Sequence, residues 1–281
     1  MREVNLPDGW APYAVAGDAT GRLWMTVLTP PGLAWLDPGG EIGHEPFAAG
    51  QPMQLSIGPD SAVWYTRSDD QLGRRDASGT HVLTGLPAGA APYGVAATPD
   101  GGAWFTAAGT NQAGRIEAGG DLTLIDLPVP DARAAMVTVD AVGTAWAALN
   151  GAGALARVRG DAVQIVELPG GAAPVGVAAS GSGVWYADIA QGRVGRIDPD
   201  SGALEQVRFA DPACRPHAVA ADPGGGCWVT LWGSGELAHV SPGGDVRLRK
   251  LPGQEPHGLW VSATHVWVAM ESGSLVAVDI R

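Results

Sequence analysis

A tryptophan that recurs about every forty residues is the feature of this sequence that most constrains its fold. The spacings between successive members of the series are 40, 40, 42, 39, 43 and 39 residues. The series consists of Trp24, Trp64, Trp104, Trp146, Trp185, Trp228 and Trp267. Because it takes up seven of the eleven tryptophans, it marks an internal repeat rather than a chance pattern.

The third copy, residues 92–128, shows the repeating unit most clearly. Four segments, YGVAATP, AWFTA, AGRIEA and LTLIDL, have the composition of β-strands, and the glycine turns DGG and GG separate two pairs of them. Each copy therefore predicts a four-stranded antiparallel meander. Units of about forty residues with four strands are typical of β-propeller blades. Seven copies predict an all-β fold, a seven-bladed β-propeller.

The two ends of the chain predict how the ring closes. The last copy stops at SLVAVDIR, its third strand, whereas the chain begins with REVNLP, which matches the fourth-strand endings LIDLP, IVELP and RLRKLP. We therefore expect residues 3–6 to form the outer strand of the blade built by residues 256–281, leaving no open sheet edge. The whole chain, residues 1–281, is then a single domain. A parallel β-helix is the poorer alternative, because its coils are shorter and need parallel pairing.

Composition argues against several classes of partner. The net charge is −12 and the 17 Lys and Arg residues are scattered, whereas phosphate binding needs basic clusters. No apolar run approaches the roughly 20 residues that cross a bilayer, and the first ten residues lack the hydrophobic segment of a signal peptide. We expect a cytoplasmic monomer without nucleic-acid or membrane partners. Cys214 and Cys227 flank a predicted strand and are expected to be free thiols.

A proline lies 11 or 12 residues before the repeat tryptophan in six copies, and Ala134 takes its place in the fourth. Proline suits the first residue of a strand, where no ladder donor is needed. The residue that follows should begin the innermost strand, beside the central channel. These seven positions, which we call the mouth residues, are Tyr13, Met53, Tyr93, Ala135, Val175, His217 and His257.

Residues that break the repeat are candidates for chemistry, because structural residues recur in every copy. Copies six, seven and one are consecutive around the ring, so His217, His257 and Tyr13 should converge on one sector. The last hairpin turns near residue 264, which predicts that Glu271 lies opposite His257. Glu255 shares a strand face with His257, and no other copy has an acid at the position of Glu271.

Two carboxylates and an imidazole in one place are compatible with more than one reaction. Each group alone is more often a solvated or hydrogen-bonded surface residue, but two adjacent acids are unfavourable unless a cation or proton compensates them. Carboxylate oxygens suit Mg²⁺, and a neutral imidazole accepts protons near pH 7. Proton abstraction beside a metal-bound carbonyl and hydrolysis by metal-bound water would use the same groups, and residue chemistry alone does not separate them.

Longer motifs favour proton abstraction over hydrolysis, because they resemble those of a known family. RPHAVAA, EPHGLWV and VWVAMES, together with APYGVAATPDGGAWFT and NQAGRI, resemble the virginiamycin B lyase (streptogramin B lyase) family of seven-bladed propellers. The resemblance implies a Mg²⁺-dependent carbon–oxygen lyase that linearises cyclic depsipeptides, the type B streptogramins virginiamycin S and quinupristin, by β-elimination at the threonyl ester, conferring antibiotic resistance. By motif it implies His257 as the general base, Glu255 and Glu271 as Mg²⁺ ligands, and His217 and Tyr13 as substrate contacts.

The sixth copy departs from the family pattern, because Leu231 stands where an acid is common and LAHV replaces the usual third strand. This departure concerns which antibiotic fits more than the chemistry. A noncatalytic propeller that binds a peptide or protein partner is the alternative function, because the fold by itself implies no activity. A lactonase-type hydrolase is a further alternative, but such enzymes draw their metal ligands from several blades, whereas these acids come from one.

Overall fold

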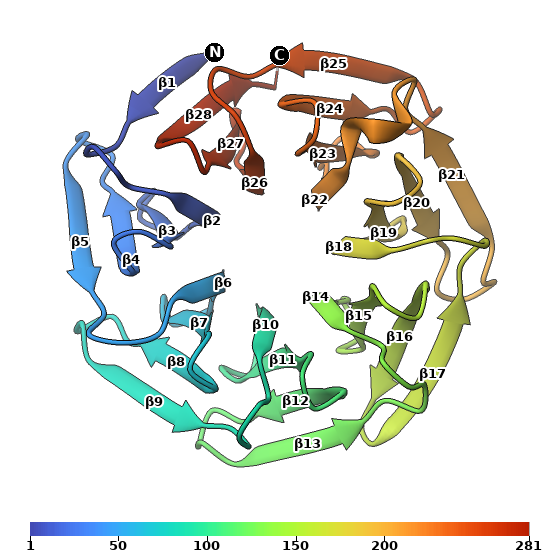
Figure 1. Ribbon diagram of the computed structural model, residues 1–281, viewed down its shortest axis with the longest axis horizontal. Coiled ribbons are helices and arrows are strands. Elements are labelled where there is room, and N and C mark those ends of the chain that lie inside the picture. Colours follow the sequence, from blue (N-terminus) through green and yellow to red (C-terminus); the bar gives the residue numbers. More distant parts are fainter. Residues whose placement is uncertain (281) are drawn as a thin grey trace.

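Seven four-stranded antiparallel sheets surround a central axis in the computed structural model, which describes residues 1–280 (Figure 1). Each sheet corresponds to one sequence repeat, so the predicted seven-bladed propeller is confirmed. In each blade the chain runs outward from the channel to the rim, and Figure 1 shows the first strand of every blade nearest the centre. Arg281, the last residue of the predicted domain and seventh blade, lies outside the described residues.

The strands of each class have similar lengths and spacings. The inner strands are β2 (Pro12–Gly17), β6 (Pro52–Ile57), β10 (Pro92–Ala97), β14 (Ala134–Val139), β18 (Pro174–Ser180), β22 (Pro216–Ala221) and β26 (Pro256–Val261). The second strands are β3 (Leu23–Val27), β7 (Val63–Arg67), β11 (Ala103–Ala107), β15 (Ala145–Leu149), β19 (Gly183–Asp188), β23 (Cys227–Leu231) and β27 (His265–Met270). The third strands are β4 (Gly32–Leu36), β8 (Gln71–Arg75), β12 (Gln112–Ile116), β16 (Ala154–Arg159), β20 (Arg193–Ile197), β24 (Glu236–Val240) and β28 (Ser274–Asp279). The outer strands are β5 (Ile42–Pro46), β9 (His81–Gly85), β13 (Leu122–Asp126), β17 (Ala162–Glu167), β21 (Leu204–Arg208), β25 (Val246–Lys250) and, for the seventh blade, β1 (Arg2–Asn5); one 3₁₀ turn, η1 (Pro212–Cys214), precedes β22.

The N-terminal strand closes the ring. β1 pairs antiparallel with β28, with Arg2 opposite Ala277 and Asn5 opposite Ser274, and the Leu6 amide continues the contact to the Gly273 carbonyl at 3.0 Å. β1 and β28 therefore lie side by side in Figure 1. The predicted closure is confirmed, because β1 covers the edge of β28 that would otherwise be unpaired.

The repeat tryptophans hold neighbouring blades together. All seven lie on second strands, are at most 8% exposed, and pack against residues of the following blade. Trp64 of the second blade, for example, shares a buried cluster with Val95 and Phe105 of the third. Large apolar side chains stabilise a structure in proportion to the area that they remove from water. The forty-residue period is therefore the period of the contacts between blades.

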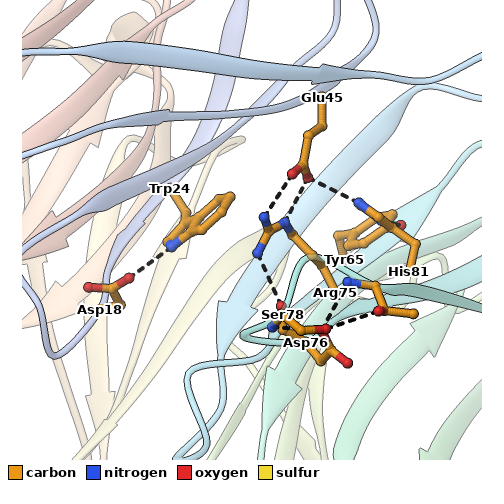
Figure 2. Close-up of polar contacts among 9 residues, drawn as sticks. Asp18, Trp24, Glu45, Tyr65, Arg75, Asp76, Ser78 and His81 are labelled. Carbon is orange, nitrogen blue, oxygen red and sulfur yellow. Dashed lines mark hydrogen bonds and ion pairs between the residues drawn. The ribbon is translucent and has the colours of Figure 1, made fainter.

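A polar contact joins the first and second blades at the rim (Figure 2). Glu45 on β5 accepts hydrogen bonds from Nε and Nη2 of Arg75 on β8, each at 2.7 Å, and contacts Nε2 of His81 on β9 at 3.0 Å. Nδ1 of His81 lies 2.8 Å from the Tyr65 hydroxyl. We call Glu45, Tyr65, Arg75 and His81 the rim cluster.

Each inner strand begins at the proline position and then deviates from regular pairing. The ladder register shifts between the first and the fourth residue of all seven inner strands, beside the mouth residue. Such irregularities change the direction of side chains at the ends of strands.

Both cysteines are buried free thiols, as expected. Among residues 1–280, no helix is long and apolar enough to cross a membrane.

Candidate active site

Three mouth residues from consecutive blades meet on one side of the channel. The ring centroids of Tyr13 and His257 are 4.3 Å apart, those of His217 and His257 4.8 Å, and those of Tyr13 and His217 6.1 Å. Each of the three residues is 7% exposed. The predicted convergence of blades six, seven and one is confirmed. We call these three residues and Glu271 the mouth cluster.

Glu271 joins the cluster through its side chain. Its Oε2 atom lies 2.5 Å from Nε2 of His257. The predicted backbone register was wrong by two positions, because Met270 faces Pro256 and the Glu271 amide donates to the Glu255 carbonyl at 3.1 Å. The strand pairing is irregular at the start of β26, so the side chains of His257 and Glu271 meet although their backbones are not directly opposed.

The prediction that Glu255 shares a strand face with His257 was wrong, because Glu255 lies in the loop directly before β26, in a left-handed conformation with φ of 56°. It is exposed, and it lies near enough to His257 to favour the protonated imidazole. Among residues 1–280, no Lys or Arg forms an ion pair with Glu255 or Glu271. The backbones of Glu255 and Glu271 are hydrogen-bonded, and carboxylates without a Lys or Arg partner are ligands that suit a hard cation such as Mg²⁺, which usually keeps several water ligands. Among the described residues, no group of three or more Asp, Glu, His or Cys side chains is arranged so that it could hold a metal ion.

Burial dominates the electrostatics of the mouth cluster. Loss of hydration lowers the pKa of His257, and this effect outweighs the opposite influence of Glu271 and Glu255. Burial and the neighbouring His257 lower the pKa of His217 to about 3. Burial, together with the neighbouring Tyr93, raises the pKa of Tyr13. At neutral pH the cluster therefore contains two uncharged imidazoles and a protonated phenol.

A cavity of about 590 Å³ adjoins the mouth cluster. Five mouth residues, from blades two to six, contribute to its wall: Met53, Tyr93, Ala135, Val175 and His217. His217 belongs to both the cavity wall and the mouth cluster. The Tyr93 hydroxyl also lies 2.6 Å from that of Tyr13, which connects the cavity to the ring packed on His257. A largely apolar cavity with a few polar groups in its wall is typical of small-molecule sites.

Tyr93 and Trp232 were not identified as site residues from the sequence. Trp232 lies 6.2 Å from His257 between ring centroids and occupies, in the sixth blade, the position that Glu271 holds in the seventh. Tyr93 is a mouth residue, so the signal for it was present, but an aromatic side chain at that position is also explained by packing. The period did not predict that Trp232 lies beside His257 or that Tyr93 contacts Tyr13, because both contacts depend on how the blades are placed around the ring.

A sequence model described as the virginiamycin B lyase family matches residues 1–278. The chain belongs to this family. A virginiamycin B lyase of Nocardia farcinica is 36% identical over 282 residues, covering 98% of both chains. The resemblance inferred from the motifs is thus confirmed.

Solved structures of the family superpose closely. The crystal structure of virginiamycin B lyase from Staphylococcus aureus has a TM-score of 0.95 at 26% identity, covering 100% of this chain and 99% of its own. A catalytically inactive histidine-to-alanine variant of the Staphylococcus aureus lyase, solved with quinupristin, has a TM-score of 0.94 at 25% identity over 100% and 99% of the two chains. Blade number and closure are therefore shared with these lyases.

Proposed function

We propose that the protein is a Mg²⁺-dependent lyase that linearises type B streptogramins such as virginiamycin S and quinupristin by β-elimination at the threonyl ester. The observation that carries the proposal is the buried, neutral imidazole of His257, held 2.5 Å from a carboxylate beside an apolar cavity. The family relationship supports it, as does the relative that a histidine-to-alanine change inactivates and that was solved with quinupristin.

The base in this proposal is Nδ1 of His257. In the neutral ring Nε2–H donates to the Glu271 carboxylate, whose side chain is 32% exposed, so the lone pair lies on Nδ1, which is buried and has no hydrogen-bond partner among the described residues. Nδ1 accepts the proton from the α-carbon of the threonyl residue. The carboxylate of Glu271 then lies beside the imidazolium and stabilises its charge.

The electron pair of the broken C–H bond forms the Cα=Cβ double bond, and the Cβ–O bond breaks with its electron pair leaving on the ester carboxylate. No water and no redox partner is consumed, so the linear product is an isomer of the cyclic substrate. When bound by Glu255 and Glu271, Mg²⁺ would supply Lewis-acid stabilisation of the charge that develops on a substrate carbonyl oxygen.

The remaining residues of the site bind and orient the substrate. His217 stays neutral because burial lowers its pKa to about 3, so it offers hydrogen bonds rather than charge. The ring of Tyr13 packs on His257 and restricts how the imidazole turns. The apolar cavity receives the parts of the depsipeptide that do not react, and it displaces water there.

Mass spectrometry of quinupristin after incubation with the protein and Mg²⁺ tests the proposal directly. Elimination leaves the mass unchanged while the retention time shifts, whereas hydrolysis adds one water. A product heavier by one water, or an unconverted antibiotic, contradicts the lyase. We also propose a cytoplasmic monomer, which cell fractionation and gel filtration would test.

A further inference from the structure

Four buried threonines on second strands make the same pair of hydrogen bonds. Each hydroxyl accepts the amide of the residue after the mouth residue in its own blade, and donates to the carbonyl of the mouth residue in the next blade. They are Thr26, Thr66, Thr106 and Thr230, all 0% exposed. One hydroxyl therefore satisfies an amide beside the strand irregularity and fixes the adjacent blade.

The sixth blade uses this device at the mouth cluster. The Ala218 amide donates to Oγ1 of Thr230 at 3.0 Å, and this hydroxyl donates to the carbonyl of His257 at 2.8 Å. Ala218 directly follows His217. One buried hydroxyl therefore joins the two strands that carry the histidines, whose ring centroids are 4.8 Å apart.

Alanine replaces the threonine in blades four, five and seven, at positions 148, 187 and 269. The blades that follow these three have Val175, His217 and Tyr13 as mouth residues. Of the three aromatic residues in the mouth cluster, His257 alone has its carbonyl held by such a hydroxyl. The alanines also indicate that the fold tolerates loss of the hydroxyl at this position.

We infer that Thr230 is a positioning residue for the reaction, acting through the main chain of His257. This inference rests on the proposed function. Thr230 is fully buried and touches no space that a substrate can reach, so its contribution is geometric. Proton transfer from carbon depends steeply on how the base is placed, and a displacement near 1 Å is enough to slow such a step by about a hundredfold.

The test compares Thr230→Ala with Thr106→Ala, which removes the same two hydrogen bonds where they join Gly94 to Ala135. We expect Thr230→Ala to lower kcat about tenfold to a hundredfold with KM changed less than about threefold. Thr106→Ala should lower the melting temperature similarly and leave kcat within about threefold of wild type. Thr230→Ser keeps the hydroxyl and should restore most of the lost rate. Equal kcat values for the two alanine variants, or no recovery with serine, would overturn the inference.

A second readout is independent of turnover. Imidazole NMR signals of His257 should shift or broaden in Thr230→Ala and stay unchanged in Thr106→Ala. If the wild type fails to convert quinupristin, the proposed function fails and this readout alone decides the positioning role. Unchanged His257 signals in Thr230→Ala would then reject it.

Discussion

The rim cluster and the mouth cluster both contain Glu, His and Tyr, but they differ in how their polar groups are satisfied, and only the rim cluster contains an arginine. At the rim, both ring nitrogens of His81 are used, Nε2 by Glu45 and Nδ1 by Tyr65. Arg75 donates two hydrogen bonds to the same carboxylate (Figure 2). Charge and hydrogen bonds are balanced there, as expected for a contact that holds two blades together.

At the mouth, Glu271 contacts Nε2 of His257, but Nδ1 of the ring has no partner among residues 1–280. The hydroxyl of Tyr13 bonds to Tyr93 instead of to the histidine. No Arg or Lys of this part of the chain pairs with Glu271. A contact between Glu and His is therefore no sign of chemistry by itself; the uncompensated charge and the unused nitrogen distinguish a site.

The difference between the two clusters should be largest when the histidine of each, His257 or His81, is replaced. We expect His257→Ala to lower kcat/KM for quinupristin by at least about a thousandfold, because a general base is lost. His81→Ala should leave kcat/KM within about threefold and lower the melting temperature, because it removes contacts between blades. Steady-state kinetics and thermal unfolding of both variants measure this. Near-normal turnover by a folded His257→Ala variant would place the base elsewhere, with His217 the next residue to test.

Replacing the carboxylates should have the next largest effect. We expect Glu255→Gln and Glu271→Gln each to reduce the rate about tenfold to a hundredfold at limiting Mg²⁺, because one charged oxygen ligand is lost. Glu45→Gln is the matched control and should affect stability only. Chelation with EDTA should stop turnover of the wild type, and added Mg²⁺ should restore it. Full activity in chelator would exclude the metal from the reaction.

The sequence predicted the fold well because its determinants recur. Seven tryptophans, six prolines and the turn glycines repeat with the blades, so period alone gave the strand order and the closure by β1. The place of the mouth cluster followed from the same period. The strand register at an irregularity does not follow from the period, and Glu271 was therefore predicted opposite His257, two positions away from its backbone partner Glu255.

Thr230 was missed for the opposite reason. Its hydroxyl recurs in four blades, so a search for residues that break the repeat passes over it. A threonine hydroxyl that recurs for structural reasons affects the reaction only in the blade where it binds the carbonyl of a catalytic residue. Recognising that requires knowing that the carbonyl bound to Thr230 belongs to His257.

The pH dependence should differ between the clusters. Burial lowers the pKa of His257, so the base stays neutral as pH falls to its ordinary 6.5 and is lost only below it. We expect kcat/KM to be level near pH 7 and to fall about tenfold per pH unit below a midpoint under 6.5. A midpoint above 6.5 would mean that the carboxylates outweigh burial.

At the rim cluster, pH should change the stability of the fold and not the rate of turnover. Burial opposes ionisation of Glu45, but the hydrogen bonds from Arg75 and His81 outweigh it and lower the pKa of the carboxyl. Its contribution to stability is therefore complete above the unfolded-state pKa and is lost as pH falls through the folded-state value. Unfolding free energy should decline more steeply below pH 4.5 in the wild type than in Glu45→Gln. Parallel curves would assign the acid sensitivity to other carboxylates.

The smallest effect should come from the tyrosines, and it sharpens what the mouth cluster needs. Tyr13→Phe keeps the ring packed on His257 and removes only the hydroxyl bonded to Tyr93. Because burial raises the pKa of Tyr13, that hydroxyl stays protonated and acts as a hydrogen-bond donor, not as a base. We expect kcat/KM to fall about threefold to tenfold, as for one lost neutral hydrogen bond.

Tyr65→Phe is the matched change at the rim, where it leaves Nδ1 of His81 without its partner and should not alter turnover. The pair of tyrosine variants thus separates a hydroxyl that acts on the substrate from one that only joins blades. If Tyr13→Phe were as inactive as His257→Ala, the hydroxyl would have to take part in the proton transfer itself. The base would then be the combined Tyr13 and His257 unit, and the deuterium isotope effect at the threonyl α-carbon should change in the Tyr13→Phe variant.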